Sequence, residues 1–248
     1  MIRVEQAGGL RLVWLDRPSK RNALTMGMVE SIRDLLREAA EERRVQCVIL
    51  AGVGPSLSSG VDLQEFFGGT VDNAHTMITA LADACAAALA CPKPVAIAIQ
   101  GHCLGGALEL ACACDFRVAS PDARLGMPEV GLGIPSVIHA ALIQRHIGLG
   151  RAQELLLTGE SIEAATALEW GLVNRVVEQD ALLQACQELL SRVTRHDPQA
   201  IARQKRLLWE WQEQPLSDAV DRSRAQLVES FATGLPQELV RRRLLERR

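Results

Sequence analysis

The chain has 248 residues, of which 48% are hydrophobic, and its formal net charge is −3 at pH 7. This length suits one large domain, or one core with a small appendage, and the weak net charge gives no sign of a nucleic-acid partner. No apolar run reaches the roughly 20 residues that cross a bilayer, and the charged start MIRVEQ lacks the apolar core of a secretory signal, so we expect a cytoplasmic protein.

The cysteines and histidines show no pattern of metal ligation. Seven cysteines is an odd number, no two of them form a CxxC pair, and the five histidines are scattered along the chain. We therefore expect reduced cysteines that pack in the core, and neither a metal ion nor a redox cofactor.

Strands and a helix alternate at the start of the chain. Ile2–Glu5 and Leu10–Leu15, separated by a glycine pair, predict a β-hairpin. Thr25 is a suitable N-cap for an amphipathic helix that extends to about Arg43. Val45–Leu50 follows as an apolar strand that we expect to be covered on both faces.

A loop rich in glycine, proline and serine comes next, over residues 52–60. Loops at strand ends often hold ligands in sheets of this kind. This loop has neither the lysine of a phosphate-binding P-loop nor the G-x-S-x-G pattern of a nucleophile elbow. An alanine-rich helix is predicted after it, over residues 73–90.

The stretch Pro94–Cys114 combines a buried strand, a glycine turn and a helix. Val95–Ile99 is the predicted strand, and the pair Gly105–Gly106 leads into the helical segment. Such a turn directs free helix-start N–H groups at a ligand, and Glu109 lies about one turn further on an otherwise apolar helix. These features indicate a reaction centre. The alternative is a buried crossover whose glycines only allow close packing.

The rest of the chain divides into a mixed part and a helical part. Asp115–Ala119 is predicted as a strand, and Glu129 follows in a segment punctuated by glycine and proline. Helical periodicity resumes over residues 136–147, 151–157 and 162–170, and the last quarter of the chain is helical throughout. We therefore assign the chain to the α/β class, with an all-helical tail.

Five segments of the chain occur in an order that covers nearly its whole length. They are DRPSKRNALT, SLSSGVDL, IQGHCLGGALELACACDFRVAS, ARLGMPEVGLGIP and TGESIEAATALEWGLVNRVV. Together they resemble the enoyl-CoA hydratase/isomerase, or crotonase, superfamily. The resemblance implies a crotonase-like superhelix of repeated ββα units over residues 1–178, which carries an acyl-CoA site. It further implies that residues 179–248 form a helical oligomerisation region, in a homotrimer or a homohexamer.

The resemblance also implies how a substrate thioester is held. Two backbone N–H groups of the family stabilise the enolate-like oxygen of an acyl-CoA, and on this chain they belong to Val61 and Gly106. One fixed donor of this kind contributes about 3–4 kcal/mol where water is excluded. Backbone donors tolerate side-chain changes, although we expect the bulk of Val61 to narrow the entrance for the acyl group.

Coenzyme A is expected along the same loop and along the basic segment near the start of the chain. By resemblance, the contacts with coenzyme A and the acyl group come from Lys20, Arg21, Ala23, Ser59, Asp62, Leu63, Gln64 and Gly105. Lys20 and Arg21 are candidates for binding the phosphates, and the alternative is a solvated basic pair. Coenzyme A is part of the substrate, so the resemblance implies no separate cofactor.

Two glutamates decide which reaction the resemblance favours. Hydratases of the family use one glutamate from the GGxxE helix and one from the PE turn, here Glu109 and Glu129. Addition of water to a C=C bond needs a base for the water proton and an acid for the α-carbon. We therefore predict hydration of a trans-2-enoyl-CoA to a 3-hydroxyacyl-CoA, as in fatty acid metabolism, with Glu129 as the main acid/base and Glu109 orienting the water. The alternative is that either glutamate caps a turn or pairs with an arginine.

One segment departs from the family pattern. A glycine-rich P-x-x-G-G loop usually follows the second glutamate, whereas this chain has Ser136, Val137 and Ile138 where small residues are expected. The bulkier loop favours a shorter or differently curved acyl group, or permits another outcome such as Δ3-Δ2 enoyl-CoA isomerisation, or is a neutral variation of a helix start. A non-catalytic, RNA-binding member of the fold is not favoured, because the chain has only three lysines and keeps both glutamates.

Overall fold

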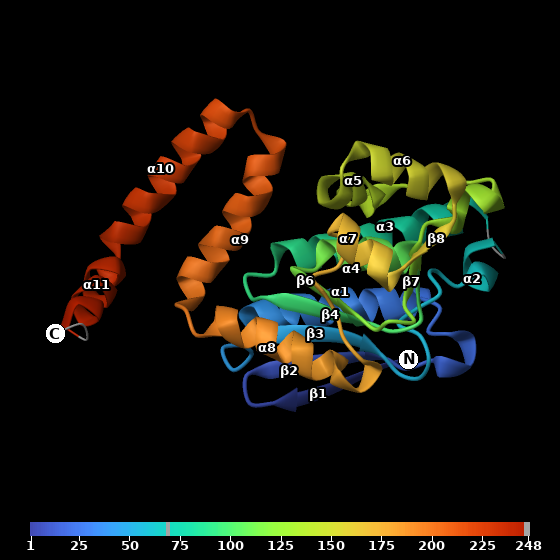
Figure 1. The fold of residues 1–248 in the computed structure, drawn as a ribbon, viewed down its shortest axis with the longest axis horizontal. Helices are drawn as coiled ribbons and strands as arrows, with labels where there is room; N and C mark the ends of the chain where they lie inside the picture. Colours follow the sequence, from blue (N-terminus) through green and yellow to red (C-terminus); the bar gives the residue numbers. More distant parts are fainter. Residues whose placement is uncertain (68–69, 246–248) are drawn as a thin grey trace. The chain divides into compact units, whose positions relative to one another are not determined.

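The computed structural model describes residues 1–67 and 70–245, and the chain divides into two compact units, Met1–Arg195 and His196–Arg248. The first unit is mixed α/β, as the alternation of strands and helices in the sequence predicts (Figure 1). The described residues of the second unit are helical, which confirms the predicted helical tail.

A large mixed sheet runs through the first unit. Its strands are β1 (Ile2–Ala7), β2 (Leu10–Leu15), β3 (Cys47–Gly52), β4 (Val95–Ile99), β6 (Phe116–Ala119) and β9 (Arg175–Val176). They lie side by side in the order β1-β2-β3-β4-β6-β9, with β1 and β2 antiparallel and the other neighbours parallel. The predicted hairpin is confirmed, and Gly8 takes a φ of +58° in its turn, a conformation that glycine adopts at no steric cost.

A second, smaller sheet is built from short strands. They are β5 (His102–Leu104), β7 (Arg124–Gly126) and β8 (Ser161–Glu163), and they pair in that order. A single bridge between Ser58 and Cys103 extends this sheet to the loop after β3. The chain thus repeats one pattern: a strand of the large sheet, then a bridge or short strand of the small sheet, then a helix. This repetition is the superhelix of ββα units that the resemblance implies.

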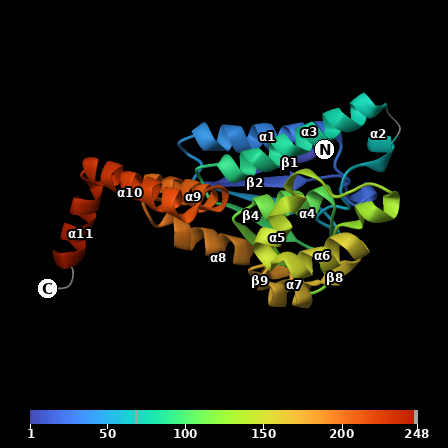
Figure 2. The same cartoon turned by 90° about the horizontal axis from the view of Figure 1, so that it is seen from above.

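Helices cover both faces of the large sheet. α1 (Met26–Glu41) and α3 (Val71–Ala90) lie on one side, and α8 (Leu182–Thr194) lies on the other (Figure 2). On the α8 side, strand residues such as Ile49 and Ala96 share one apolar core with that helix. Because both faces are covered, the middle strands β3 and β4 are apolar along nearly their whole length, as expected for a parallel sheet between helices.

Helix α1 begins where the sequence predicts. The Thr25 hydroxyl accepts a hydrogen bond from the Met28 amide at 3.3 Å, which satisfies one of the free N–H groups of the first turn. The apolar face of the helix, which includes Ile32 and Leu36, is fully buried. Burial of one such side chain contributes about 1.5–3 kcal/mol, so this face anchors the helix on the rest of the unit.

The remaining helices of the first unit are short. They are α2 (Leu63–Phe67), α4 (Gly106–Ala113), α5 (Ala141–Ile147), α6 (Leu149–Thr158) and α7 (Ala164–Trp170), with 3-10 turns η1 (Pro18–Lys20), η2 (Pro128–Leu132), η3 (Ile138–Ala140) and η4 (Gln179–Ala181). α4 is buried over all its residues and is the central helix of the unit. The helix expected over residues 136–147 starts later than predicted, and the helix expected from residue 162 starts only after β8.

The second unit consists of consecutive helices. They are α9 (Pro198–Glu213), α10 (Leu216–Ala232) and α11 (Leu235–Leu245). Asp197 caps α9 by accepting a hydrogen bond from the Ala200 amide at 2.9 Å, and the Trp211 indole donates to the Ser223 hydroxyl of α10 at 2.8 Å. α8 packs on the large sheet, so the compact units divide after this helix and not at residue 178. The oligomerisation role of the helical region stays a prediction.

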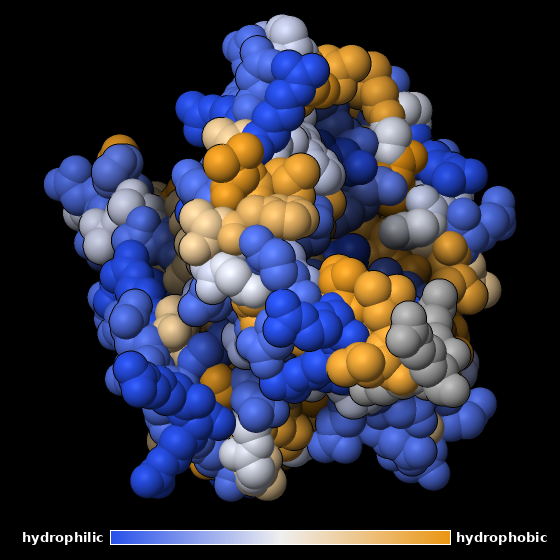
Figure 3. Space-filling model, turned by 90° about the vertical axis from the view of Figure 1, so that its left-hand side faces the viewer, coloured by the Kyte–Doolittle hydropathy of each residue, from blue (hydrophilic) through white to orange (hydrophobic). Residues whose placement is uncertain are grey.

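Apolar side chains remain exposed on the second unit. They include Leu227, Val228, Phe231, Val240 and Leu244. Figure 3 shows hydrophobic and hydrophilic residues interspersed on one face of the molecule. Within residues 1–67 and 70–245, the structure contains no helix with the length and apolar character needed to cross a membrane.

Candidate active site

Val61 lies in a short extended segment that is fixed by pairing with Leu24. The Leu24 amide donates to the Gly60 carbonyl at 2.8 Å, and the Asp62 amide donates to the Leu24 carbonyl at 2.8 Å. In this parallel pairing the amide of Val61 itself points away from Leu24. Among the residues that the structure describes, the Val61 amide donates to no other group of the chain, so it is available to a ligand.

Gly106 begins the buried helix α4 directly beside Val61. Its amide is one of the N–H groups at the helix start, which have no intrahelical partner. A Cβ atom at position 106 would lie 3.3 Å from Val61 Cγ1 and 2.5 Å from Leu81 Cδ2, so a larger residue would force these side chains to move. The two predicted backbone donors, far apart in the sequence, are therefore neighbours in space.

Glu109 follows one turn later in α4 and is almost completely buried, with 3% of its surface exposed. Its Oε2 atom accepts hydrogen bonds from the amides of His139 at 2.8 Å and Ala140 at 3.0 Å. Burial raises the pKa of Glu109 to about 8; the nearby charge of Glu129 acts in the same direction, and the two amides oppose it. We therefore expect this carboxyl group to carry a proton at neutral pH.

The two amides that hold Glu109 come from the segment that departs from the family pattern. Ile138 has a φ of +43°, a left-handed conformation that is rare for a β-branched side chain. Successive amides after such a residue form a concave cluster of N–H groups, which suits a carboxylate or another anion. The segment predicted to shape the acyl pocket thus also fixes one of the glutamates.

Glu129 lies in η2, just after Pro128, and faces the glycine turn. A Cβ atom on Gly105 would collide with Glu129 Oε1, which places this carboxyl oxygen directly against the turn that precedes Gly106. The other oxygen, Oε2, accepts a hydrogen bond from the Ser136 hydroxyl at 3.2 Å. Burial raises the pKa of Glu129, while its own backbone amide and Ser136 lower it. The turn, both glutamates and the two donors therefore form one group.

The loop that carries Val61 is fastened by an ion pair that the sequence analysis did not identify. The Arg17 guanidinium donates to Asp62 Oδ2 at 2.5 Å and to the Ala23 carbonyl at 3.2 Å. The other oxygen of Asp62 accepts from the Gln64 amide at 2.9 Å, at the start of α2. Arg17 holds the pKa of Asp62 below its usual range. Asp62, predicted to lie near coenzyme A, thus has a side chain engaged in supporting the loop.

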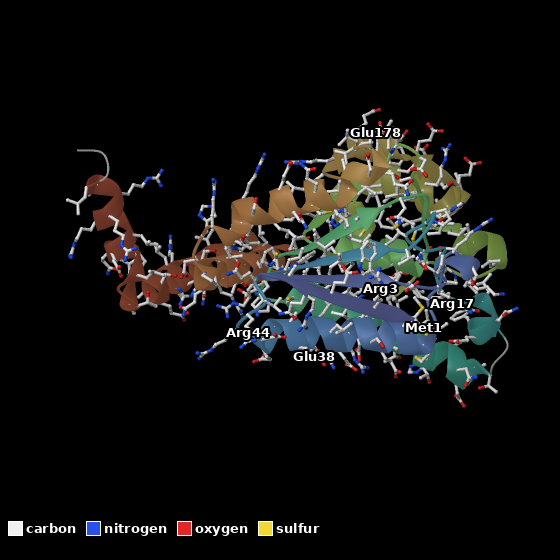
Figure 4. The ribbon with its side chains drawn as sticks, turned by 90° about the horizontal axis from the view of Figure 1, so that it is seen from below. Met1, Arg3, Arg17, Glu38, Arg44 and Glu178 are labelled. Atoms are coloured by element: carbon white, nitrogen blue, oxygen red, sulfur yellow. The ribbon has the colours of Figure 1, made fainter. Side chains whose placement is uncertain are left out.

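The basic segment predicted to bind phosphates runs beside this loop. Lys20 and Arg21 are exposed, Ala23 is half-buried, and the Ser59 amide donates to the Arg21 carbonyl at 2.9 Å. Arg17 and Met1, labelled in Figure 4, border a cavity of about 700 Å³ at the same end of the unit. Of the other expected contacts, Leu63 and Gln64 are exposed on α2 and Gly105 is buried against Glu129.

A buried asparagine, also missed by the sequence analysis, holds this segment against the next loop. The Asn22 side chain is fully buried and donates to the carbonyls of Val53 at 2.9 Å and Ser56 at 2.8 Å, while its oxygen accepts from the Arg17 amide at 2.7 Å. An asparagine and an arginine in a turn carry no distinctive spacing, so only the motif DRPSKRNALT as a whole pointed to this region.

The residues of this group do not form a metal site. Over residues 1–67 and 70–245, the structure contains no cluster of three or more histidine, cysteine, aspartate or glutamate side chains that is arranged to hold a metal ion. Six of the seven cysteines are buried, and Cys47 is half-buried.

The family model for enoyl-CoA hydratase/isomerase matches residues 5–242. The chain belongs to the enoyl-CoA hydratase/isomerase family. It is 33% identical to the 2,3-dehydroadipyl-CoA hydratase of Escherichia coli, over 86% of this chain and 83% of the relative. It is 32% identical to the short-chain-enoyl-CoA hydratase of Clostridium acetobutylicum, over 83% of this chain and 79% of the relative.

Solved structures of this family share the fold of the chain. The crystal structure of an enoyl-CoA hydratase from Bacillus anthracis superposes with a TM-score of 0.86 and 30% identity, over 90% of this chain and 88% of that one. The predicted crotonase fold is therefore confirmed. As a member of this family the protein is an enzyme of the crotonase superfamily.

Proposed function

We propose that this family member is an enoyl-CoA hydratase, which adds water to the double bond of a trans-2-enoyl-CoA and gives a 3-hydroxyacyl-CoA. The grouping of the amides of Val61 and Gly106 with the carboxyl groups of Glu109 and Glu129 carries the proposal. An enoyl thioester needs both kinds of group, because its oxygen gains negative charge while protons move at its α-carbon and at the attacking water.

The amides of Val61 and Gly106 are the proposed oxyanion hole. When the water oxygen bonds to the β-carbon, the π electrons of the double bond shift and the thioester oxygen becomes negative. Two fixed N–H donors stabilise that charge without any reorganisation at the moment of reaction. The proposal is supported by the closeness of residues 61 and 106 and by the pairing of Val61 with Leu24 and the start of α4, which fix the backbone at each position.

The two glutamates have different roles toward one water molecule: one orients it, and the other takes up its proton. Two negative carboxylates close together repel, so the pair favours a state with a single proton, and the more deeply buried Glu109 is the better holder of it. Protonated Glu109 orients the water by a hydrogen bond. Ionised Glu129 accepts one proton of the water as the O–C bond forms, and then transfers a proton to the α-carbon. One water is consumed, and both glutamates return to their initial states.

Coenzyme A is proposed to lie along the loop that carries the oxyanion hole. Lys20 and Arg21 are exposed and free of a described ion pair with an acidic side chain, which leaves them available to the phosphates. The proposed contacts of the rest of the molecule are Ala23, Ser59, Asp62, Leu63, Gln64 and Gly105. Since coenzyme A arrives with the substrate, we propose that the reaction uses no other cofactor.

The acyl pocket is proposed to favour short chains. The side chains of Leu81 of α3 and Val61 lie close to Gly106, and η3 packs against both α3 and α4. The two curated relatives described above are named for different acyl groups at nearly equal identity, so identity alone does not select the acyl group of this protein.

Hydration of crotonyl-CoA by the purified protein tests the proposal. The enoyl-thioester absorbance should fall, and mass spectrometry should show a product heavier by one water. Glu129→Gln, which removes the proton acceptor, and Glu109→Leu, which removes the hydrogen-bond donor to the water, should both lose the reaction while they keep the fold. The absence of hydration with short- and medium-chain trans-2-enoyl-CoA substrates would overturn the proposal.

A second candidate is a Δ3-Δ2 enoyl-CoA isomerase. One observation favours it: two amides hold Oε2 of the buried Glu109, whereas Glu129 is more accessible and is sufficient for moving one proton between two carbons. A 3-enoyl-CoA substrate distinguishes the candidates. An isomerase would remain active as Glu109→Leu, whereas a hydratase, which needs the side chain of residue 109 to orient the water, would not.

We further propose that the protein works in the cytoplasm on intermediates of fatty acid metabolism, as a homotrimer or homohexamer. The exposed apolar residues of α10 and α11 support assembly through the second unit. Light scattering coupled to size-exclusion chromatography should give a mass three or six times that of the chain, and a monomer would contradict this assembly.

A further inference from the structure

One short segment contacts both proposed catalytic carboxyl groups. The amides of His139 and Ala140 hold Oε2 of Glu109, and the hydroxyl of Ser136 donates to Oε2 of Glu129 at 3.2 Å. The two kinds of contact differ in one important respect. Any sequence supplies the backbone amides, whereas the contact with Glu129 requires a hydroxyl side chain at position 136.

The contact with Ser136 fixes the orientation of the carboxyl group of Glu129. This group can rotate about its last side-chain bond, and a hydrogen bond to one oxygen holds its plane so that the other oxygen faces the glycine turn. In the structure, Ser136 holds Oε2, and Oε1 lies against Gly105, next to the helix start at Gly106. A hydrogen bond from a hydroxyl also stabilises the ionised form of a carboxyl group over the protonated form.

We propose that Ser136 is a positioning residue, which orients Glu129 toward the glycine turn and keeps it ionised for proton transfer. This role rests on the proposed function insofar as Glu129 is the acid/base. The sequence comparison with the family marks position 136 only as a departure from small residues, and the structure assigns that departure a contact with the reacting group.

Charged and titratable side chains near Glu129 come from α4, η3 and α6. Glu109 of α4 faces it and is electrostatically coupled to it, and His139 of η3 is half-buried on the same segment as Ser136. α6 also packs against η2, and its charged side chains, Arg151 and Glu154, are exposed to solvent. The backbone amide of Glu129 also donates a hydrogen bond to the carboxyl group of the same residue. Among these neighbours, Ser136 contributes a side-chain donor that a single substitution removes.

Titration of Glu129 in side-chain variants of Ser136 tests this role. Carbon-13 labelling of glutamate carboxyl groups allows each pKa to be followed by NMR, and loss of one resonance in Glu129→Gln identifies the signal. Ser136→Ala should raise the pKa of Glu129, because one stabilising donor of the ionised form is gone. Ser136→Thr keeps the hydroxyl and should restore the original value.

The pH profile of activity provides the second readout. If Glu129 acts in its ionised form, kcat/KM falls at low pH as Glu129 takes up a proton, so Ser136→Ala should move that acid limb to higher pH by the same amount. Ser191→Ala removes an exposed hydroxyl of α8 outside the site and should move neither readout. If Ser136→Ala fails to fold, Ser136→Cys keeps a similar volume with a weak donor and should give an intermediate shift.

The outcomes separate this inference from the proposed function. An unchanged pKa of Glu129 in a folded Ser136→Ala, or an equal shift in Ser191→Ala, would overturn the role of Ser136. A shifted pKa in a protein that hydrates no enoyl-CoA would leave the contact with Glu129 in place and overturn the hydratase proposal instead. A lower melting temperature with no shift in either readout would indicate a merely structural serine.

Discussion

The two halves of the proposed site are built in different ways. The oxyanion half consists of backbone amides at Val61 and Gly106, and strand pairing and a buried helix start hold them. The acid/base half consists of side chains, Glu109 and Glu129, which an irregular segment holds through amides and a hydroxyl. The first half should therefore depend on local geometry and be indifferent to pH, whereas the second should be sensitive to single functional groups and to pH.

Removal of the charge of Glu129 should have the largest effect and break the acid/base half alone. Glu129→Gln should lower kcat by about 10²–10⁴-fold, the usual contribution of general acid–base catalysis. The backbone donors remain, so the affinity for a product-like acyl-CoA should change little. Steady-state kinetics and calorimetric titration of the variant measure both effects. An equal loss of kcat and of acyl-CoA affinity would contradict the division of the site into two halves.

The oxyanion half can be disturbed without any change in charge. In Gly106→Ala the new Cβ would lie 2.5 Å from Leu81 Cδ2 and 3.3 Å from Val61 Cγ1, so these side chains must shift, which disturbs the packing beside both amides. We expect kcat to fall about 100-fold, as for the loss of one oxyanion donor, with an unchanged pH profile.

Gly150→Ala is the matched control for this substitution. It adds a methyl group within α6, where no atom lies within 4 Å of the new Cβ, and should leave kcat unaltered. Exposed helical glycines generally cost about 0.5–1 kcal/mol relative to alanine, so this control should be slightly more stable than the parent protein. Full activity of Gly106→Ala would contradict the assignment of the Gly106 amide to the oxyanion hole.

The pH dependence of stability and of activity tests the protonation of Glu109, a group of the acid/base half. Its pKa of about 8 is above the ordinary value of 4.5, so the folded protein binds this proton more tightly than the unfolded chain does. The stabilisation is complete below pH 4.5 and is lost as the pH rises toward 8. We expect activity to fall up to about tenfold per pH unit above this pKa, because ionised Glu109 places a second negative charge beside the developing enolate.

Thermal unfolding measures the same linkage without any substrate. The melting temperature of the parent protein should decrease between pH 6 and pH 9 by more than that of Glu109→Gln, which has no proton to lose at this position. Identical pH dependence in the two proteins would show that Glu109 ionises normally and would contradict its role as the protonated partner.

The ion pair behind the oxyanion loop should give the smallest effect on rate. Arg17→Met leaves the buried Asp62 carboxylate without its guanidinium partner, which should cost about 1–3 kcal/mol of stability and lower kcat several-fold through the loop of Val61. Arg17 lowers the pKa of Asp62, so this stabilisation is present above the ordinary pKa of 3.8 and is lost as the pH falls below it.

A surface ion pair controls for the loss of an arginine. Arg124→Met removes the exposed partner of Glu163 and should change neither stability nor kcat measurably. Chemical denaturation and steady-state kinetics check both variants. Equal effects in Arg17→Met and Arg124→Met would show that the pair with Asp62 does not support the loop.

Segments with strong local patterns were predicted correctly. The hairpin of β1 and β2, the cap of α1 at Thr25 and the buried strand β4 all follow from short-range signals: turn residues, a capping hydroxyl and an unbroken apolar run. The short strands β5, β7 and β8 were missed, because three residues are too few to show a period and their pairing partners are distant in the sequence.

By itself, the sequence determined the class of fold, the family and the identity of the candidate groups, since motifs and periodicities are local properties of the chain. Only the tertiary structure decided which groups meet. It placed Gly106 beside Val61, assigned Asp62 to Arg17, and gave Ser136 a contact with Glu129. The reason is physical: burial, left-handed backbone and hydrogen bonds between distant segments arise from the packing of the whole chain, and no short stretch of sequence carries them.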